Sequence, residues 1–127
     1  MGKLQESLAA LERVSQLGPS NPEALYVKGI VLQQLDQQQE AVAAYSKAIA
    51  IAPQWARPYL NRAAAYARLG QTEQSLNDLE RAVELDPECR DAAVGSPDLD
   101  SLRDNDRYRK LTNKTAASTI PRPAANP

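Results

Sequence analysis

Four aspartates lie close together near the end of the 127-residue chain, and their spacing invites comparison with a calcium site. They are Asp98, Asp100, Asp104 and Asp106. A helix–loop–helix calcium loop needs glycine at its sixth place and a bidentate glutamate at its twelfth. Counted from Asp98, these places hold Arg103 and Arg109, and counted from Asp104 they hold Arg109 and Thr115. We therefore expect no metal site and interpret the aspartates as caps and solvated surface.

Cys89 is the only cysteine of the chain, and histidine is absent from the sequence. A thiol acts as a nucleophile only as the thiolate, and without histidine the activating group would have to be Arg90 or a helix N-terminus. The absence of histidine also removes the commonest general acid–base group and the commonest transition-metal ligand. We expect Cys89 to be a structural, partly buried thiol, and we expect no cofactor and no enzymatic activity.

The overall charge is close to neutral, with 15 basic and 16 acidic residues and a formal net charge of −1. Such a balance gives no general attraction to nucleic acid or to an anionic membrane surface. No stretch approaches the roughly 20 apolar residues that span a bilayer, and the N-terminus lacks the apolar core of a secretion signal. We therefore expect no nucleic-acid partner, no membrane insertion and a cytoplasmic location.

An internal repeat of 34 residues is the strongest pattern in the chain. A shift by this length places apolar residues on apolar residues and proline on proline. The superposed pairs are Leu25 with Tyr59, Leu32 with Tyr66, Leu35 with Leu69, Val42 with Leu76, Tyr45 with Leu79, Ala48 with Ala82, Ile51 with Leu85, and Pro53 with Pro87. The same register extends backwards, so we interpret residues 3–18 as the lone second helix of a partial repeat.

Spacing within each unit indicates helices, because the apolar residues recur at steps of three and four. Asn21 is a good N-cap with Pro22 as the first helical residue, and Asp86-Pro87-Glu88 repeats that signal. Gly70 can adopt the left-handed conformation that ends a helix, and Asp36 occupies the equivalent turn in the earlier unit.

These residues resemble the tetratricopeptide repeat family. Its signature combines a large apolar residue, a small residue four places later, an aromatic after three more, then a small–aromatic–small set and a proline. The first unit has Leu25, Gly29, Leu32, Ala41, Tyr45, Ala48 and Pro53 at these places, and the second has Tyr59, Ala63, Tyr66, Ser75, Leu79, Ala82 and Pro87. The resemblance implies an all-α fold whose antiparallel helix pairs, residues 22–55 and 56–89, stack as a short right-handed superhelix.

The repeat pattern fails after residue 89. Gly95-Ser96-Pro97 interrupts the helix that a third unit would need, and Ser96 can cap a new short helix. The apolar anchors that follow are Leu99, Leu102, Tyr108 and Leu111. We interpret residues 90–113 as a degenerate C-terminal helical cap over the last repeat. Residues 114–127 contain three prolines and few large apolar residues, so we expect a disordered tail.

Partner binding is the function that the resemblance implies, because the first helix of each repeat lines a concave groove in this family. The groove positions are Tyr26, Val27, Ile30, Gln33, Arg57, Leu60, Asn61, Ala64 and Arg68. Asn61 could hold a peptide backbone, while Arg57 and Arg68 could pair with acidic groups of a ligand. The alternative for Val27 and Leu60 is burial in the core. We predict a non-catalytic module that binds a peptide or helix of a partner protein.

One subgroup of the family grips the C-terminal carboxylate of heat-shock chaperones. It uses Lys and Asn in one repeat, Asn in the next, and Lys and Arg in a third. In this chain Asn61 matches, whereas the other four places hold Tyr26, Ile30, Asp91 and Gly95. We therefore expect that this chain does not hold chaperone tails in that way.

Two alternatives to groove binding remain open from the sequence. The first is self-association through the uncovered face of the N-terminal helix, which carries Leu4, Leu8 and Leu11. The second is that the chain is a regulatory or substrate-recruiting piece of a larger enzyme.

Overall fold

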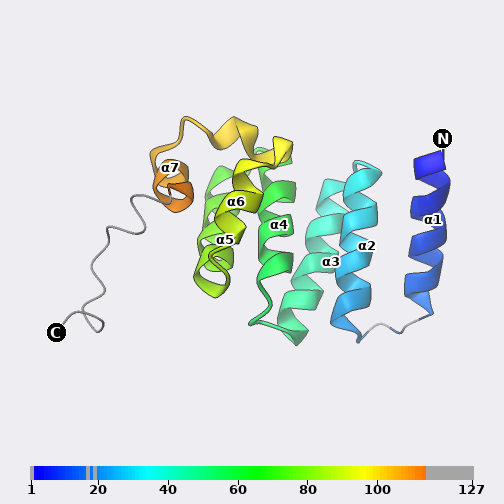
Figure 1. Ribbon diagram of the computed structural model, residues 1–127. Helices are drawn as coiled ribbons and strands as arrows, with labels where there is room; N and C mark the ends of the chain where they lie inside the picture. Colours follow the sequence, from blue (N-terminus) through cyan, green and yellow to red (C-terminus); the bar gives the residue numbers. More distant parts are fainter. Residues whose placement is uncertain (1, 17, 19, 114–127) are drawn as a thin grey trace.

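The computed structural model describes residues 2–16, 18 and 20–113, and this part of the chain is helical without a strand (Figure 1). The helices are α1 (Gly2–Ser15), α2 (Pro22–Gln34), α3 (Gln38–Ile51), α4 (Ala56–Arg68), α5 (Thr72–Leu85), α6 (Cys89–Val94), the 3₁₀ helix η1 (Pro97–Leu102) and α7 (Asp106–Thr112). The all-α prediction is therefore confirmed. No described helix is long and apolar enough to cross a membrane.

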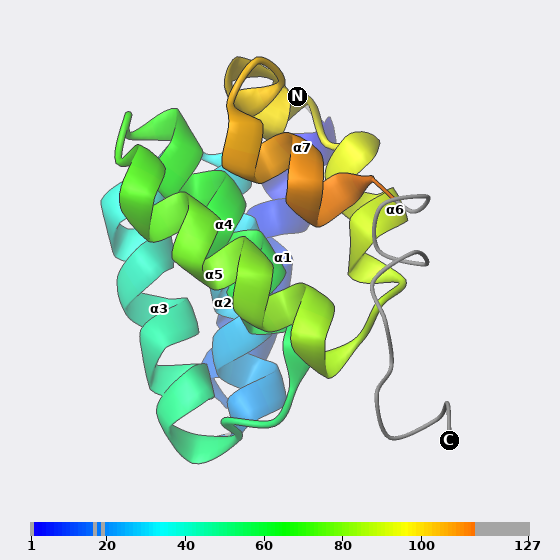
Figure 2. The ribbon, with the colours of Figure 1, turned by 90° about the vertical axis from the view of Figure 1, so that its left-hand side faces the viewer.

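The helices stand side by side in a row, in the order of the sequence. α1 packs on α2, α2 pairs with α3, and α3 in turn contacts α4, which pairs with α5. Viewed along the row, α5 and α7 lie nearest the viewer and α1 lies at the far end (Figure 2). The first helices α2, α4 and α6 all begin at the lower edge of the row (Figure 1). The antiparallel pairs α2–α3 and α4–α5 correspond to the two units of the sequence repeat.

The turn and cap signals at three positions act as predicted. Asn21 precedes α2, and its Oδ1 accepts a hydrogen bond of 3.0 Å from the Ala24 N–H. Gly70 ends α4 in the left-handed region with a φ of 76°. Asp36 has a φ of 59° at the equivalent place after α2. The 34-residue repeat thus extends to the backbone conformation of the turns.

The helix start predicted at Asp86-Pro87-Glu88 is wrong, because α6 begins only at Cys89. Asp86 is instead the extended C-cap residue that follows α5, and its Oδ1 accepts a hydrogen bond of 3.0 Å from the Glu88 N–H. The Cys89 N–H donates to the Asp86 carbonyl at 2.9 Å, which closes a turn over Pro87. The side-chain hydrogen bond of Asp86 therefore stabilises a turn between two helices and does not cap α6.

The closest helix contact of the first pair lies where α3 faces the small residue of α2. A Cβ added to Gly29 would meet the Tyr45 ring, with 2.6 Å left to Cδ1 and 2.7 Å to Cζ. Tyr45 is fully buried. The second pair carries Ala63 and Leu79 at the same two places, both fully buried. In each repeat, the small residue of the first helix therefore leaves room for the side chain of the second: Gly29 for Tyr45, and Ala63 for Leu79.

Among the described residues, the buried apolar clusters of the two halves of the row differ in size. The cluster between α2 and α3 contains the buried residues Leu32, Ala41, Ala44 and Tyr45. The cluster of α4, α5 and the following segment contains Ala56, Leu60, Ala63, Leu76, Leu79, Ala82, Val83, Cys89, Ala93, Leu99, Leu102 and Tyr108. The anchors predicted for residues 90–113 thus pack on the second repeat, with Leu111 partly buried against them.

A bidentate ion pair joins three of the central helices. Arg62 on α4 contacts Asp78 on α5 through Nε–Oδ2 at 2.6 Å and Nη2–Oδ1 at 2.7 Å. The Arg62 Nη1 also donates to the Ser46 Oγ on α3 at 3.0 Å. The guanidinium carbon lies 5.9 Å and 5.7 Å from the ring centres of Tyr59 and Tyr66. The hydrogen bonds to Asp78 raise the pKa of Arg62 further, so the arginine stays charged.

An arginine also fastens the last helix to the second repeat. Arg107 on α7 donates through Nη2 to Asn77 Oδ1 at 2.8 Å and to Glu80 Oε1 at 2.9 Å. Its Nη1 lies 3.5 Å from Glu73 Oε2. All three partners are on α5, so the contact fixes α7 across that helix.

The N-terminal helix α1 contacts α2 through a hydrogen bond of 2.7 Å from Ser7 Oγ to Gln34 Oε1. Leu11 is half-buried, whereas the side chains of Leu4 and Leu8 lie outside the described part. Self-association through this face therefore stays a prediction. The disordered tail predicted for residues 114–127 also falls outside the described residues.

Candidate functional site

The nine residues predicted to line a groove come from α2 and α4, the first helices of the two repeats, which also contact each other. We call the surface formed by their accessible members and Trp55 the α2–α4 face. Half-buried members are Tyr26, Val27, Ile30, Gln33 and Asn61, and exposed members are Arg57 and Arg68. These seven residues keep surface that a partner protein can contact.

Leu60 and Ala64, the remaining two, are buried, with exposed fractions of 6% and 8%. Leu60 belongs to the core cluster that also contains Cys89 and Leu99. The reason is that α6 and η1 pack against α4 and cover this part of it. We therefore leave Leu60 and Ala64 out of the α2–α4 face.

Two aromatic contacts shape the α2–α4 face, and the sequence pattern missed both partners of Tyr26. The ring of Tyr26 lies 4.9 Å from the ring of Trp55, centre to centre, at an interplanar angle of 54°. On its other side it lies 5.9 Å from the buried Tyr45 ring, at 47°. Trp55 is the only tryptophan of the chain and immediately precedes α4. Its place at the boundary of the repeat was the signal that could have found it.

A chain of polar groups lies beneath the aromatic rings. Asn61 Nδ2 donates to Tyr45 Oη at 3.4 Å, and the Tyr45 hydroxyl donates to Gln33 Oε1. Burial raises the pKa of Tyr45, so its hydroxyl keeps its proton. Burial also raises the pKa of Tyr26, against the opposing effects of Arg57 and of a hydrogen bond with Asn61. The network therefore consists of neutral donors and acceptors and links α2, α3 and α4.

The two predicted arginines differ in their surroundings. Arg68 lies between two carboxylates, 3.7 Å from Asp36 Oδ1 and 3.6 Å from Asp98 Oδ1. Both pairs are exposed to solvent, so each is weak. Arg57 is exposed and takes part in none of the ion pairs found among the described residues. The role predicted for Arg68 with an acidic ligand would therefore compete with contacts within the chain.

The residues first considered for chemistry have structural surroundings. Cys89 is 2% exposed, and burial raises the pKa of its thiol. A protonated, inaccessible thiol is a poor nucleophile. Asp100 lies 2.9 Å from Arg103, and Asp104 lies 3.5 Å from Arg109. These side chains therefore have structural roles, and the stacked helix pairs define a helical-repeat protein.

Comparison with known proteins identifies the repeat. A family profile described as Tetratricopeptide repeat matches residues 56–89, and one described as TPR repeat matches residues 34–70. The chain belongs to the tetratricopeptide repeat family, whose members are in general protein-interaction modules.

Individual relatives match this chain over a small part of their own length. Over 87 residues, or 68% of the chain, it is 32% identical to Hsp70-Hsp90 organizing protein 1 of Glycine max. Over 77 residues, or 61% of the chain, it is 39% identical to Hsp70-Hsp90 organizing protein 3 of Arabidopsis thaliana. A UDP-N-acetylglucosamine--peptide N-acetylglucosaminyltransferase of Giardia intestinalis is 31% identical over 86 residues, or 68% of the chain. These matches span 15%, 14% and 6% of the respective relatives.

Proposed function

We propose that this chain is a non-catalytic module that binds a peptide segment of a partner protein on the α2–α4 face. The observation that carries the proposal is the ring pair of Tyr26 and Trp55, half-buried and 4.9 Å apart. Such aromatic groups supply much of the binding energy at protein interfaces, because they bury a large area at a small loss of side-chain entropy.

The polar network gives this face a fixed shape before a ligand arrives. Asn61 and Gln33 are both held through the hydroxyl of Tyr45, whose ring is fully buried. A surface that needs no ordering on binding avoids part of the entropic cost of association. The Asn61 amide is thereby placed to exchange hydrogen bonds with the backbone of an extended peptide.

The names of the plant relatives raise heat-shock chaperones as partners of this chain as well. The residues of this chain argue against a grip on a C-terminal carboxylate. Tyr26 and Ile30 stand at two of the required places on α2, and Asp91 on α6 would repel a carboxylate. We therefore propose that the ligand is an internal segment, so that amidation of its C-terminus leaves the affinity unchanged.

Selection of a random peptide library on the full chain tests the proposal. Selected peptides are then titrated while the fluorescence of Trp55 is followed, since this single tryptophan lies on the proposed surface. We expect Tyr26→Ala to weaken binding about tenfold or more, as is typical of an aromatic anchor. Selected peptides whose affinity is insensitive to this change would show that the α2–α4 face is not the binding surface.

The matched control is Lys47→Ala, because Lys47 is exposed on α3 and outside the α2–α4 face. This variant should bind as the unchanged chain does. Circular dichroism of both variants establishes that the helices remain folded. Equal losses in Tyr26→Ala and Lys47→Ala would indicate a general effect on the fold.

A further inference from the structure

We propose that the segment bound on the α2–α4 face inserts a lysine or arginine side chain against the rings of Tyr26 and Trp55. This inference rests on the proposed function and adds the chemical class of the ligand. Three observations support it: the geometry of the two rings, the acidic residues around them, and the position of Arg57.

The ring pair has the geometry of a site for a cation. The two rings are tilted by 54° at a centre distance of 4.9 Å, so a side chain at their edge meets more than one aromatic surface. A cation within about 6 Å of a ring face is attracted by the ring quadrupole, and tryptophan gives the strongest attraction. Because burial raises the pKa of Tyr26, its ring stays uncharged and its hydroxyl stays available as a hydrogen-bond acceptor.

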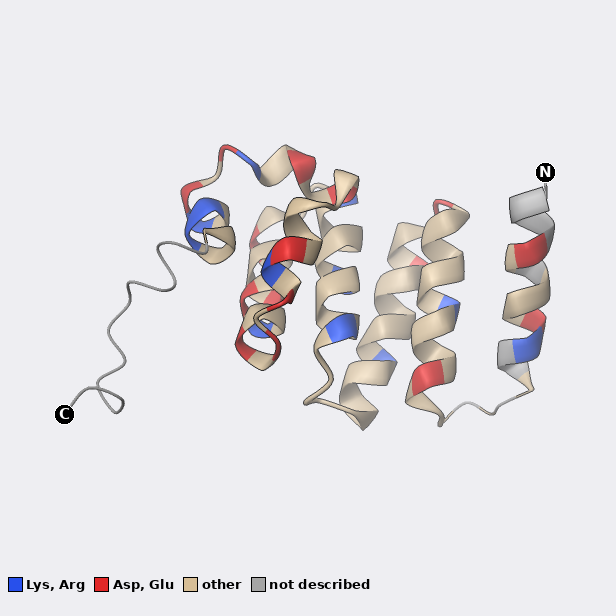
Figure 3. Ribbon diagram, in the orientation of Figure 1, with Lys and Arg blue, Asp and Glu red and all other residues tan. Residues whose placement is uncertain are grey.

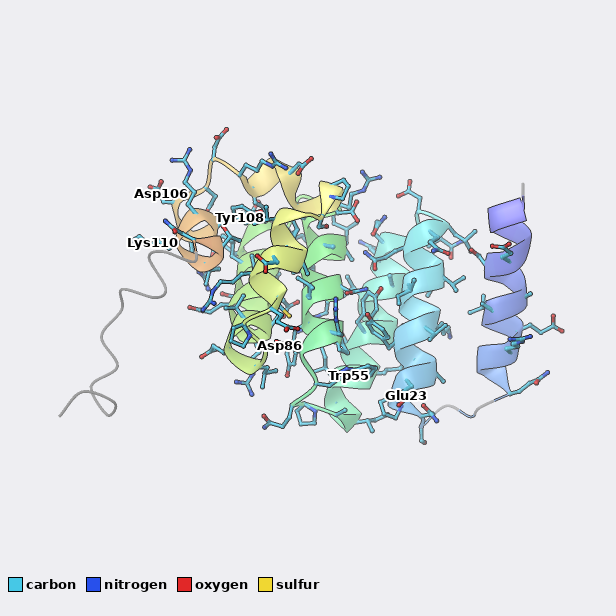
Figure 4. All side chains as sticks on the ribbon, viewed as in Figure 1. Glu23, Trp55, Asp86, Asp106, Tyr108 and Lys110 are labelled. Carbon is cyan, nitrogen blue, oxygen red and sulfur yellow. The ribbon has the colours of Figure 1, made fainter. Side chains whose placement is uncertain are left out.

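A carboxylate lies next to this pair on the same face of α2. Glu23 is exposed in the first turn of α2 and precedes Tyr26 by three residues. Residues three apart on a helix are surface neighbours, with Cβ atoms about 5–6 Å apart. In the view of Figure 4, Glu23 and Asp86 lie on either side of Trp55, along the lower edge of the row where the first helices begin. An ammonium or guanidinium group at the edge of the ring pair would therefore have a counter-charge nearby.

Acidic groups outnumber basic groups around the first turns of α2, α4 and α6 (Figure 3). The described carboxylates there are those of Glu23, Asp86, Glu88 and Asp91, and the guanidinium groups are those of Arg57 and Arg90. The balance is two negative charges. This end of the α2–α4 face thus complements a basic segment and repels an acidic one.

Arg57 is the one described cation that acts on Tyr26, and its own surroundings are acidic. Asp86, Arg57 and Glu88 all act electrostatically on the Cys89 thiol, so two carboxylates oppose the charge of Arg57 at that side chain. The positive charge of Arg57 is therefore opposed by nearby carboxylates, and Arg57 does not form an isolated basic site for an acidic ligand.

Two charge-neutralising variants with opposite expected signs test the inference. Peptides selected on the full chain are sequenced for enrichment of Lys and Arg over Asp and Glu. A selected peptide is then titrated at low salt against Glu23→Gln and Arg57→Gln. We expect Glu23→Gln to weaken binding about twofold to fivefold and Arg57→Gln to strengthen it by a similar factor, as for exposed charges. Both effects should shrink at high salt.

The outcomes separate this inference from the proposed function. Enrichment of acidic residues, or weaker binding by Arg57→Gln, would overturn the inference that the ligand is basic. If Tyr26→Ala still weakens binding in that case, the α2–α4 face remains the binding surface. Binding that is insensitive to Tyr26→Ala overturns both. Replacement of the critical lysine of a selected peptide by its neutral acetylated form should remove most of the affinity, and full retention would also overturn the inference.

Discussion

Replacing Gly29 by alanine would test the close contact between α2 and α3. The added Cβ would come nearest to Cε1 of the Tyr45 ring and within 2.6 Å of Cδ1, and the ring is fully buried. Overpacking of this kind costs about 3 kcal/mol, and the better helix propensity of alanine returns about 1 kcal/mol. We therefore expect Gly29→Ala to lower the free energy of unfolding by about 2 kcal/mol.

The second repeat provides the compensating change, since Ala63 and Leu79 occupy the equivalent places. Tyr45→Leu alone should cost about 2–3 kcal/mol through lost ring contacts and two lost hydrogen bonds. Combining Gly29→Ala with Tyr45→Leu removes the clash but keeps the propensity gain, so the double variant should be about 3 kcal/mol more stable than the sum of the single effects predicts.

Urea denaturation followed by circular dichroism measures the free energy of unfolding of the unchanged chain, the two single variants and the double variant. Additive single effects, with no coupling between the two positions, would refute the reasoning, because the cost of Gly29→Ala would then have a source other than the Tyr45 ring. The double variant also loses the hydroxyl that holds Gln33 and Asn61. It should therefore regain stability without regaining peptide affinity in the Trp55 fluorescence titration.

Four further substitutions test other parts of the fold by denaturation. Asp78→Ala should cost about 3 kcal/mol, because it leaves the half-buried Arg62 guanidinium without its counter-charge. Asp100→Ala at an exposed pair should cost under about 1 kcal/mol. Gly70→Ala should cost about 1–2 kcal/mol for backbone reasons alone, since no atom lies within 4 Å of the added Cβ. Asn21→Ala should cost about 1 kcal/mol by removing the cap of α2, and an unchanged melting temperature would contradict that role.

Much of the fold could be predicted from the sequence because the repeat carries several independent signals. The 34-residue period aligned small residues, turn residues and prolines at once, and the turns at Asp36 and Gly70 share one backbone conformation. The period fails after residue 89, so it cannot describe residues 90–113. Close to that end, the Asp86 side chain accepts a hydrogen bond within a turn and does not cap a helix, and this choice depends on hydrogen bonds that form only in the folded chain.

The candidate site was less predictable, because accessibility depends on contacts between distant residues. Leu60 and Tyr26 occupy the same place in their repeats, yet α6 and η1 bury the first and leave the second half-exposed. The ring pair joins Tyr26 on the first helix of one unit to Trp55, the residue that ends the same unit, so the three- and four-residue steps of a helix do not relate them. Sequence periodicity gives the direction of a side chain on its own helix, whereas burial depends on what packs against that helix.

The uneven core has a consequence for how the chain opens locally. Stability in a helical repeat is nearly a sum of terms from each unit and its neighbours, so the half with the smaller core opens more often. That half contains α2 and α3, with Tyr26 packed at its edge, while Asn61 belongs to the half that shares its core with η1 and α7. A ligand that contacts both Tyr26 and Asn61 would link the half that opens more often to the more stable half. Binding would then suppress the local opening of α2 and α3. This effect should be measurable as slower amide hydrogen exchange along α3.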